Sequence, residues 1–199
     1  KYGIPSKDKI ILTVGRNHKK KGYSLIPDII LTLKNNGESF KWVIIGKDCE
    51  DIKEKAQILN VYHHLIFIDE VGVKRNDFKE FSRLPSKEII EIYFSSDVFC
   101  FPTVVESFGN VFLEAMATGI PIITTDAPGA RDLIKNNFNG FVSRVDDIKG
   151  LSHNIIKAFK SKNKIKNIIH NGRQEVKKYD INTIAPLYQD HYAGIISKK

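Results

Sequence analysis

The stretch from Val104 to Pro121 reads VVESFGNVFLEAMATGIP. It follows Asp97-Val-Phe-Cys-Phe101, an apolar and β-prone run that predicts a buried strand. Glu106 would therefore lie just beyond the carboxyl end of that strand, where ligands of open α/β sheets collect. We predict a strand, a turn and a short helix here, and we expect the rest of the chain to be organised around them.

The start of the predicted helix offers a seat for an anion. Gly109 lets the backbone approach a ligand closely. The free backbone amides of this turn would direct donors and the positive end of the helix dipole at a phosphate. They belong to Ser107, Phe108, Gly109, Asn110 and Val111. Glu114, one turn inside the helix, can accept two hydrogen bonds from a vicinal diol such as a ribose.

The same helix has an apolar stripe and a sharp end. Leu113, Met116 and Ala117 recur at helical spacing, so we expect them to face the core. Gly119 occupies the position that ends many helices, and Pro121 prevents continuation. The helix is therefore expected to be short and to lead at once into the next strand.

Apolar runs of strand length alternate with helical patterns along the chain. Strands are expected at 10–14, 42–46, 65–68, 97–101, 120–124 and 141–143, and helices around 25–33, 51–59, 86–95, 130–134, from 146 onward, 165–179 and 183–196. This alternation is typical of an α/β fold with a mainly parallel sheet of about six strands and right-handed crossovers. The last helix is amphipathic and is expected to need a partner surface.

A basic loop follows the first strand. Arg16 and Lys21 lie within it, bracketed by Gly15 and Gly22. Arginine offers a planar fork for phosphate oxygens and lysine a mobile point charge, so the pair suits a diphosphate. Because this loop and the Gly109 turn both follow strands of one parallel sheet, they are expected to approach one crevice.

Each carboxylate also has a simpler interpretation. Glu106 could merely complement the helix dipole, a contribution of about 0.3 to 1 kcal/mol. Glu114 could be a solvated helix residue. The joint arrangement of a glycine, free amides and two carboxylates eight positions apart favours a binding site.

Composition sets the broad class. The chain has 199 residues, 42% of them hydrophobic and 27% charged, which is ordinary for a soluble globular domain. We expect reduced thiols at Cys49 and Cys100, no transmembrane span and no secretory signal. The net charge of +8 favours anionic partners, although a solvated lysine-rich surface is the simpler explanation and the one we prefer. We find no interleaving of aromatic and basic residues of the kind that binds nucleic acid, and we expect no nucleic-acid partner.

The connection from 71 to 85 is unusually long and basic. It carries Lys74, Arg75, Lys79 and Arg83. A long loop in a compact domain is often functional, so this one either covers a ligand or is an insertion.

The string from Glu106-Ser-Phe-Gly109 through Glu114-Ala-Met-Ala117 to Pro121 resembles the Glu-x7-Glu signature of retaining glycosyltransferases of the GT-B fold, family 4, also described as glycosyl transferases group 1. Gly15-Arg16 followed by Lys21-Gly22 is similar to the diphosphate loop of that family. The resemblance covers most of the chain. It implies a Rossmann-like, three-layer α/β/α domain that forms the C-terminal, donor-binding half of such an enzyme.

By this resemblance, residues 1–9 are an interdomain linker, 10–180 bind a UDP-, GDP- or ADP-sugar, and 181–199 form a helix that packs on an N-terminal acceptor domain. It implies a cytoplasmic hexosyltransferase of polysaccharide or lipopolysaccharide biosynthesis, free or peripheral at the inner face of the membrane. The isolated half would be inactive. No cofactor or metal is implied, and we find no paired aspartates at a strand end that would recruit one.

The resemblance also implies roles for single residues. Glu106, Arg16 and Lys21 would be catalytic, with Arg16 and Lys21 holding the donor diphosphate and Glu106 contacting the transferred sugar. Gly15 and the amides of the Gly109 turn would complete the donor site, and Glu114 would hold the ribose. The open alternative is a nucleotide-sugar-binding module without catalysis, or a nucleic-acid-binding domain.

Two positions depart from the family pattern. After the fifth strand the family often has a Gly-Gly pair and a glutamate, where this chain has Pro128-Gly129-Ala130-Arg131-Asp132, so Asp132 is the candidate substitute. The third strand ends Phe67-Ile-Asp69 in place of Phe-x-Gly. That region frames the base in the family, so base preference stays open.

Overall fold

The computed structural model describes residues 3–69 and 85–196. Its centre is a six-stranded parallel sheet in the order β3-β2-β1-β4-β5-β6. The strands are β1 (Lys9–Val14), β2 (Phe40–Ile45), β3 (Leu65–Ile68), β4 (Val98–Phe101), β5 (Ile122–Thr125) and β6 (Phe141–Ser143). The predicted α/β fold with six strands is confirmed.

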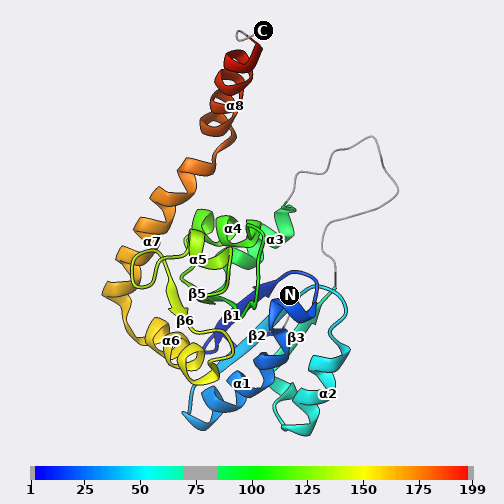
Figure 1. The fold of residues 1–199 in the computed structure, drawn as a ribbon. Coiled ribbons are helices and arrows are strands. Elements are labelled where there is room, and N and C mark those ends of the chain that lie inside the picture. Colours follow the sequence, from blue (N-terminus) through cyan, green and yellow to red (C-terminus); the bar gives the residue numbers. More distant parts are fainter. Residues whose placement is uncertain (1–2, 70–84, 197–199) are drawn as a thin grey trace.

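Helices cover both faces of the sheet and make it the middle of three layers (Figure 1). One face carries α1 (Ile26–Asn35), α2 (Glu50–Ile58) and α6 (Ile148–Lys160). The other carries α3 (Lys87–Phe94) and α4 (Asn110–Thr118), with α7 (Lys162–Val176) packed along α4. Shorter elements complete the fold: α5 (Ala130–Leu133), η1 (Lys19–Lys21), η2 (Tyr23–Leu25), η3 (Tyr62–His64) and η4 (Lys177–Tyr179).

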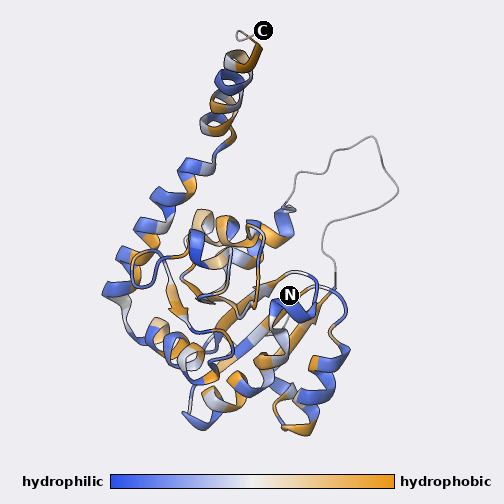
Figure 2. Ribbon diagram, in the orientation of Figure 1, coloured by the Kyte–Doolittle hydropathy of each residue, from blue (hydrophilic) through white to orange (hydrophobic). Residues whose placement is uncertain are grey.

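The apolar strand runs are explained by this layering. Every residue of β4 and β5 is buried, and every residue of β2 except the partly buried Lys41. A strand between two helical layers has no solvent face, so its sequence is continuously apolar and does not alternate. Apolar residues accordingly concentrate in the central strands, while the outer helix surfaces are largely hydrophilic (Figure 2).

The buried face of α4 differs from the expected one. Phe112, Ala115 and Met116 are buried, whereas Leu113 is only partly buried and Ala117 is exposed. Both sets satisfy helical spacing, so the sequence does not distinguish them. The phase is set by the ring of Phe112, which packs edge-on against two rings of β4 at centroid distances of 6.2 and 5.6 Å.

The sheet order places a topological switch point between β1 and β4. From β1 the chain proceeds outward through β2 and β3, then returns to the other side of β1 and proceeds through β4, β5 and β6. The loops that leave neighbouring strands in opposite directions open a crevice at their carboxyl ends, which is where ligands of such sheets bind. Both predicted site loops leave strands at this point.

The C-terminal helix α8 (Ile181–Ile196) extends away from the sheet (Figure 1). Leu187, Tyr188 and Tyr192 are each at least 60% exposed. These apolar residues of α8 are thus uncovered in this chain, as expected of a helix that packs on a partner surface. The assignment of 181–199 to an interdomain contact stays a prediction. Within the described ranges, no helix combines the length and apolar character that crossing a bilayer requires. The basic connection at 71–85 lies outside the described residues, apart from Pro85.

Candidate functional site

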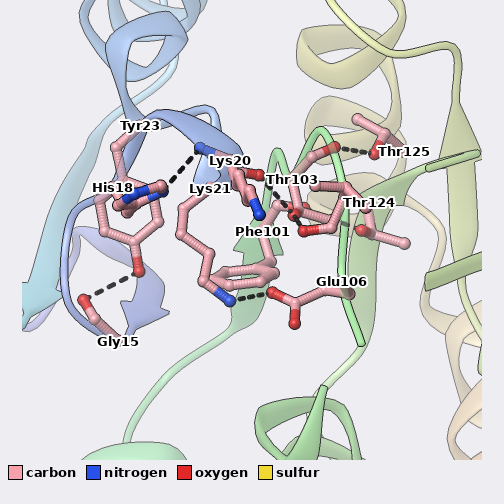
Figure 3. A network of polar contacts seen from close by, with 11 residues as sticks. Gly15, His18, Lys20, Lys21, Tyr23, Phe101, Thr103, Glu106, Thr124 and Thr125 are labelled. Carbon is pink, nitrogen blue, oxygen red and sulfur yellow. Dashed lines mark hydrogen bonds and ion pairs between the residues drawn. The ribbon is translucent and has the colours of Figure 1, made fainter. Parts of the chain in front are cut away.

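One backbone carbonyl fastens the loop after β1 to the loop after β4. The carbonyl of Lys20 accepts hydrogen bonds from the backbone N–H of Val104 at 2.8 Å, from that of Val105 at 3.2 Å and from the Thr103 hydroxyl at 3.0 Å. Thr103 is itself held from β5, because its carbonyl accepts a hydrogen bond from the Thr125 hydroxyl (Figure 3). Segments more than 80 residues apart in sequence are thus fixed side by side.

Two glycines allow close backbone approaches around the site. At Gly22, where φ is +66°, a Cβ atom would lie 1.9 Å from the carbonyl oxygen of Pro102. At Gly129, with φ of +79°, it would lie 2.1 Å from the carbonyl oxygen of Glu106. The N–H of Glu106 in turn donates to the carbonyl of Pro128 at 2.9 Å. The Pro128-Gly129 turn therefore packs closely on both the N–H and the carbonyl of Glu106.

The three hydrogen bonds to the Lys20 carbonyl, called the Lys20 clasp below, bring Lys21 close to Glu106. Their side chains form an ion pair in which Lys21 is 29% exposed and Glu106 only 7% (Figure 3). The Lys21 ammonium also lies 5.3 Å from the ring centroid of Phe101, close enough for a cation–π contact. Glu106 is therefore neither solvated nor a simple dipole complement, because it is a nearly buried carboxylate with a lysine partner.

A cavity of about 500 Å³ opens beside this ion pair. Its walls contain nine of the predicted donor-binding residues: Gly15, Arg16, Lys21, Glu106, Ser107, Phe108, Gly109, Asn110 and Val111. Val14, His18 and Phe101 also line it. The structure thus brings the cationic loop and the Gly109 turn to one cavity.

The turn presents free donors to this cavity. Gly109 adopts φ of +81° and precedes α4 without a side-chain cap. Within the described part of the chain, the backbone N–H groups of residues 107–111 donate no hydrogen bond. Unpaired amides at a helix start carry partial positive charge, so together with Lys21 they form a surface suited to an anion.

Arg16 lines the cavity, but its side chain is paired elsewhere. Its guanidinium Nε donates to the carboxylate of Asp48, which follows β2 and has φ of +62°. Both side chains are exposed, at 78% and 53%. An exposed ion pair contributes about 0 to 1 kcal/mol, so an anion in the cavity could draw the guanidinium away at small cost.

Glu114 does not line the cavity beside Lys21. It borders a second cavity of about 770 Å³ between α3, α4 and residues 176–181. The Tyr93 hydroxyl donates a hydrogen bond to Glu114 Oε2 at 2.9 Å. Burial raises the pKa of Glu114 above its ordinary value, and the Tyr93 hydrogen bond partly opposes that rise. The carboxylate is half-buried and anchored, not freely solvated.

Sequence comparison identifies the family. The profile described as "Glycosyl transferases group 1" matches residues 1–175. The chain belongs to this family.

Individual relatives agree with this assignment. The group 1 domain is 29% identical over 170 residues to the capsular polysaccharide biosynthesis glycosyltransferase CapM of Staphylococcus aureus, which covers 84% of this chain and 41% of CapM. A glycosyltransferase from Rickettsia africae superposes on the whole chain with a TM-score of 0.82 at 22% identity, over 50% of its own length.

Anabaena Alr3699/HepE, solved in complex with UDP and glucose, superposes on 95% of this chain and 49% of its own with a TM-score of 0.80 at 18% identity. These two solved structures share the three-layer α/β/α fold of the group 1 domain. The chain thus spans about half the length of the proteins it matches.

The structure also adds residues that the sequence analysis missed. Thr103 and Gly129 secure the Glu106 backbone, Tyr93 anchors Glu114, and Asp48 pairs with Arg16. Asp48 follows the strand next to β1, so its position at the same sheet edge was a usable signal. Thr103 and Tyr93 act through hydroxyl hydrogen bonds and Gly129 through a close backbone approach, and all three depend on how the chain packs in three dimensions.

Two further predictions concern metal and Asp132. Asp132 is exposed on α5 and does not line the Lys21 cavity, so nothing supports it as the family glutamate. In the described ranges, His, Cys, Asp and Glu side chains form no group of three that could hold a metal ion. Metal independence itself stays a prediction.

Proposed function

We propose that this group 1 domain binds the nucleoside-diphosphate sugar donor of a retaining hexosyltransferase. The observation that carries the proposal is the cavity in which Lys21, Glu106 and the free amides of residues 107–111 meet at the switch point. The amides and Lys21 would hold the diphosphate, and Glu106 would contact the sugar.

The arrangement suits departure of a nucleoside diphosphate. As the bond from the sugar to the phosphate oxygen breaks, negative charge grows on the leaving group and the sugar becomes cation-like. Donors that are already oriented stabilise that charge most when it is largest, which lowers the barrier. Lys21 and the amides are held in place by the Lys20 clasp, so they need little reorganisation. Arg16 would join them after leaving Asp48.

The Lys21–Glu106 ion pair explains how sugar and phosphate could share one site. Lys21 pairs with Glu106 and lines the same cavity as the amide turn, so a phosphate bound there would share its charge. Glu106 would then have an oxygen free to accept a sugar hydroxyl. We propose that transfer occurs on the same face of the sugar, with retention of configuration. We also propose that no metal ion is needed, because lysine, arginine and amides supply the positive charge that a metal would otherwise provide.

The complete enzyme would need a second half. The chain covers 41% of CapM, and we propose that an N-terminal domain supplies the acceptor site and that α8 packs on it. The isolated chain would then bind donor without transferring sugar, because the acceptor site is missing. We further propose a glycan or glycolipid acceptor, with the lysine-rich surface favouring one at an acidic membrane, and flotation with anionic liposomes tests that contact.

Thermal unfolding of the chain with UDP, GDP, ADP and their sugars would identify the donor class, since a ligand of the folded state raises stability by mass action. Calorimetry with the stabilising nucleotide then tests the site. Loss of a charge-assisted hydrogen bond costs about 1.5 to 3 kcal/mol. Lys21→Met should therefore weaken the nucleoside diphosphate by at least about tenfold.

The matched control for Lys21 is Lys9→Met. Lys9 forms an ion pair with Asp97 at 2.8 Å, at the amino end of β1 and thus at the opposite edge of the sheet. This variant should bind the nucleotide like the parent. Equal affinity of the parent and Lys21→Met would remove Lys21 from the site. Stabilisation by oligonucleotides in place of nucleotides would favour the nucleic-acid alternative.

A further inference from the structure

Tyr93 is a buried residue whose only polar atom points at a predicted ligand contact. It lies in α3 with 1% of its surface exposed. Its hydroxyl donates to Glu114 Oε2, across the interface between α3 and α4, at 2.9 Å. The Tyr93 hydroxyl thus holds a half-buried carboxylate at the edge of a cavity, which is a role beyond filling space in the core.

The ring of Tyr93 is held firmly. It packs against Phe99 of β4 with centroids 5.8 Å apart, and Phe99 stacks on Phe101 at 5.9 Å. Phe101 is the ring beneath Lys21. One aromatic cluster therefore contacts both the Tyr93 ring and the Lys21 ammonium.

The second oxygen of Glu114 is available. In the described ranges Glu114 Oε1 accepts no hydrogen bond, and the carboxylate borders the 770 Å³ cavity. A carboxylate oxygen can accept more than one hydrogen bond, so Oε1 can receive a hydroxyl pair while Oε2 is held.

We propose that Tyr93 is a positioning residue, which holds one carboxylate oxygen of Glu114 so that the other faces the 2′ and 3′ hydroxyls of the donor ribose. This inference rests on the proposed function and adds a specificity determinant to it. Without the hydroxyl, Glu114 would lose its anchor and sample other rotamers. The ribose contact would then weaken while the diphosphate contact would not change.

Protonation favours this role. Burial raises the pKa of the Tyr93 hydroxyl well above its ordinary value, so the hydroxyl stays a donor. Because donation to a carboxylate favours its charged form, Tyr93 also opposes the effect of burial on Glu114.

The test is calorimetry of the 199-residue chain with UDP, 2′-deoxy-UDP and pyrophosphate. UDP serves as the probe because Alr3699/HepE was solved with it. Tyr93→Phe keeps the ring and removes only the hydroxyl. Since one hydrogen bond changes affinity by about two- to tenfold, UDP should weaken by that factor and the preference for UDP over 2′-deoxy-UDP should shrink. Pyrophosphate should bind within about twofold of the parent, which also shows that the variant is folded.

The matched control is Tyr23→Phe. Tyr23 is equally buried, at 1% exposed, but its hydroxyl donates to the Gly15 carbonyl at 3.1 Å. Loss of that bond should leave the ratio of UDP to 2′-deoxy-UDP affinity unchanged. A double-mutant cycle gives a second measure, because Tyr93→Phe should cost little once Glu114→Gln has removed the charge that it positions.

The outcomes separate the two proposals. If Glu114→Gln reduces the preference for UDP over 2′-deoxy-UDP and Tyr93→Phe does not, the role of Tyr93 is wrong and the donor site stands. If the effects of the two substitutions add fully, Tyr93 acts independently of Glu114 and the inference is again overturned. If pyrophosphate affinity survives Lys21→Met, the proposed function fails at the diphosphate, whatever Tyr93 does.

Discussion

At Gly22 the loop after β1 passes close to the backbone that follows β4, so this residue offers a sharp perturbation of the Lys20 clasp. Substitution with alanine places a Cβ atom 1.9 Å from the carbonyl oxygen of Pro102, and that atom is backbone and cannot rotate away. The loops would have to separate, which would stretch the bonds to the Lys20 carbonyl. Lys21 would then move away from Glu106.

The magnitude has two parts. A residue with a Cβ in the left-handed conformation costs about 1 to 2 kcal/mol. Overpacking against fixed neighbours adds about 1 to 3 kcal/mol. Gly22→Ala should therefore lower the free energy of unfolding by about 2 to 5 kcal/mol.

Gly37→Ala is the matched control, because Gly37 has a similar φ of +75° and nothing within 4 Å of the added atom. It should lose only the conformational part, about 1 to 2 kcal/mol. Urea unfolding measures both variants, and the nucleotide affinity of Gly22→Ala should fall as well because Lys21 is displaced. Equal destabilisation of the two variants, or an unchanged nucleotide affinity of folded Gly22→Ala, would refute the clasp.

Three further predictions follow from the charges around the site. Asp48→Asn should bind a nucleoside diphosphate up to about fivefold more tightly than the parent, because it frees Arg16 from an exposed ion pair; calorimetry showing weaker binding would mean that Asp48 orients Arg16. The pKa of Glu114 is higher in the folded state than its ordinary value of 4.5. The free energy of unfolding should therefore fall as pH rises from the ordinary pKa to the folded-state pKa, because the unfolded chain ionises first. Urea unfolding from pH 4 to 7 should therefore show a smaller loss for Glu114→Gln, and an identical pH dependence would contradict the burial of the carboxylate. Excess EDTA should leave nucleotide affinity unchanged, and a loss restored by Mg²⁺ would disprove metal independence.

The sequence predicts the sheet well because both faces of a parallel sheet are buried. Runs such as Trp42-Val-Ile-Ile have no solvent side, so apolar continuity alone locates the strand. The approach of Lys21 to Glu106 is also predictable, since each residue follows a strand and the two strands are neighbours. The binding roles of these residues stay predictions.

Side-chain pairing is what the sequence does not reveal. Phe112 and Leu113 fit helical spacing equally well, and only the packing of the Phe112 ring on β4 decides which is buried. Arg16 turns to Asp48 because β2 lies beside β1, which is a consequence of strand order. Glu114 faces α3, where the Tyr93 hydroxyl donates to it, and no spacing rule predicts that contact.

The central claim is that a diphosphate binds between Lys21 and the free amides before α4. The most direct measurement is a ¹⁵N–¹H NMR titration of the chain with pyrophosphate and then with UDP. The amide signals of residues 107–111 should shift most with both ligands, and that of Glu114 should shift further with UDP alone. Largest shifts at the amino edge of the sheet, around Lys9 and Asp97, with the 107–111 signals unmoved, would contradict the claim.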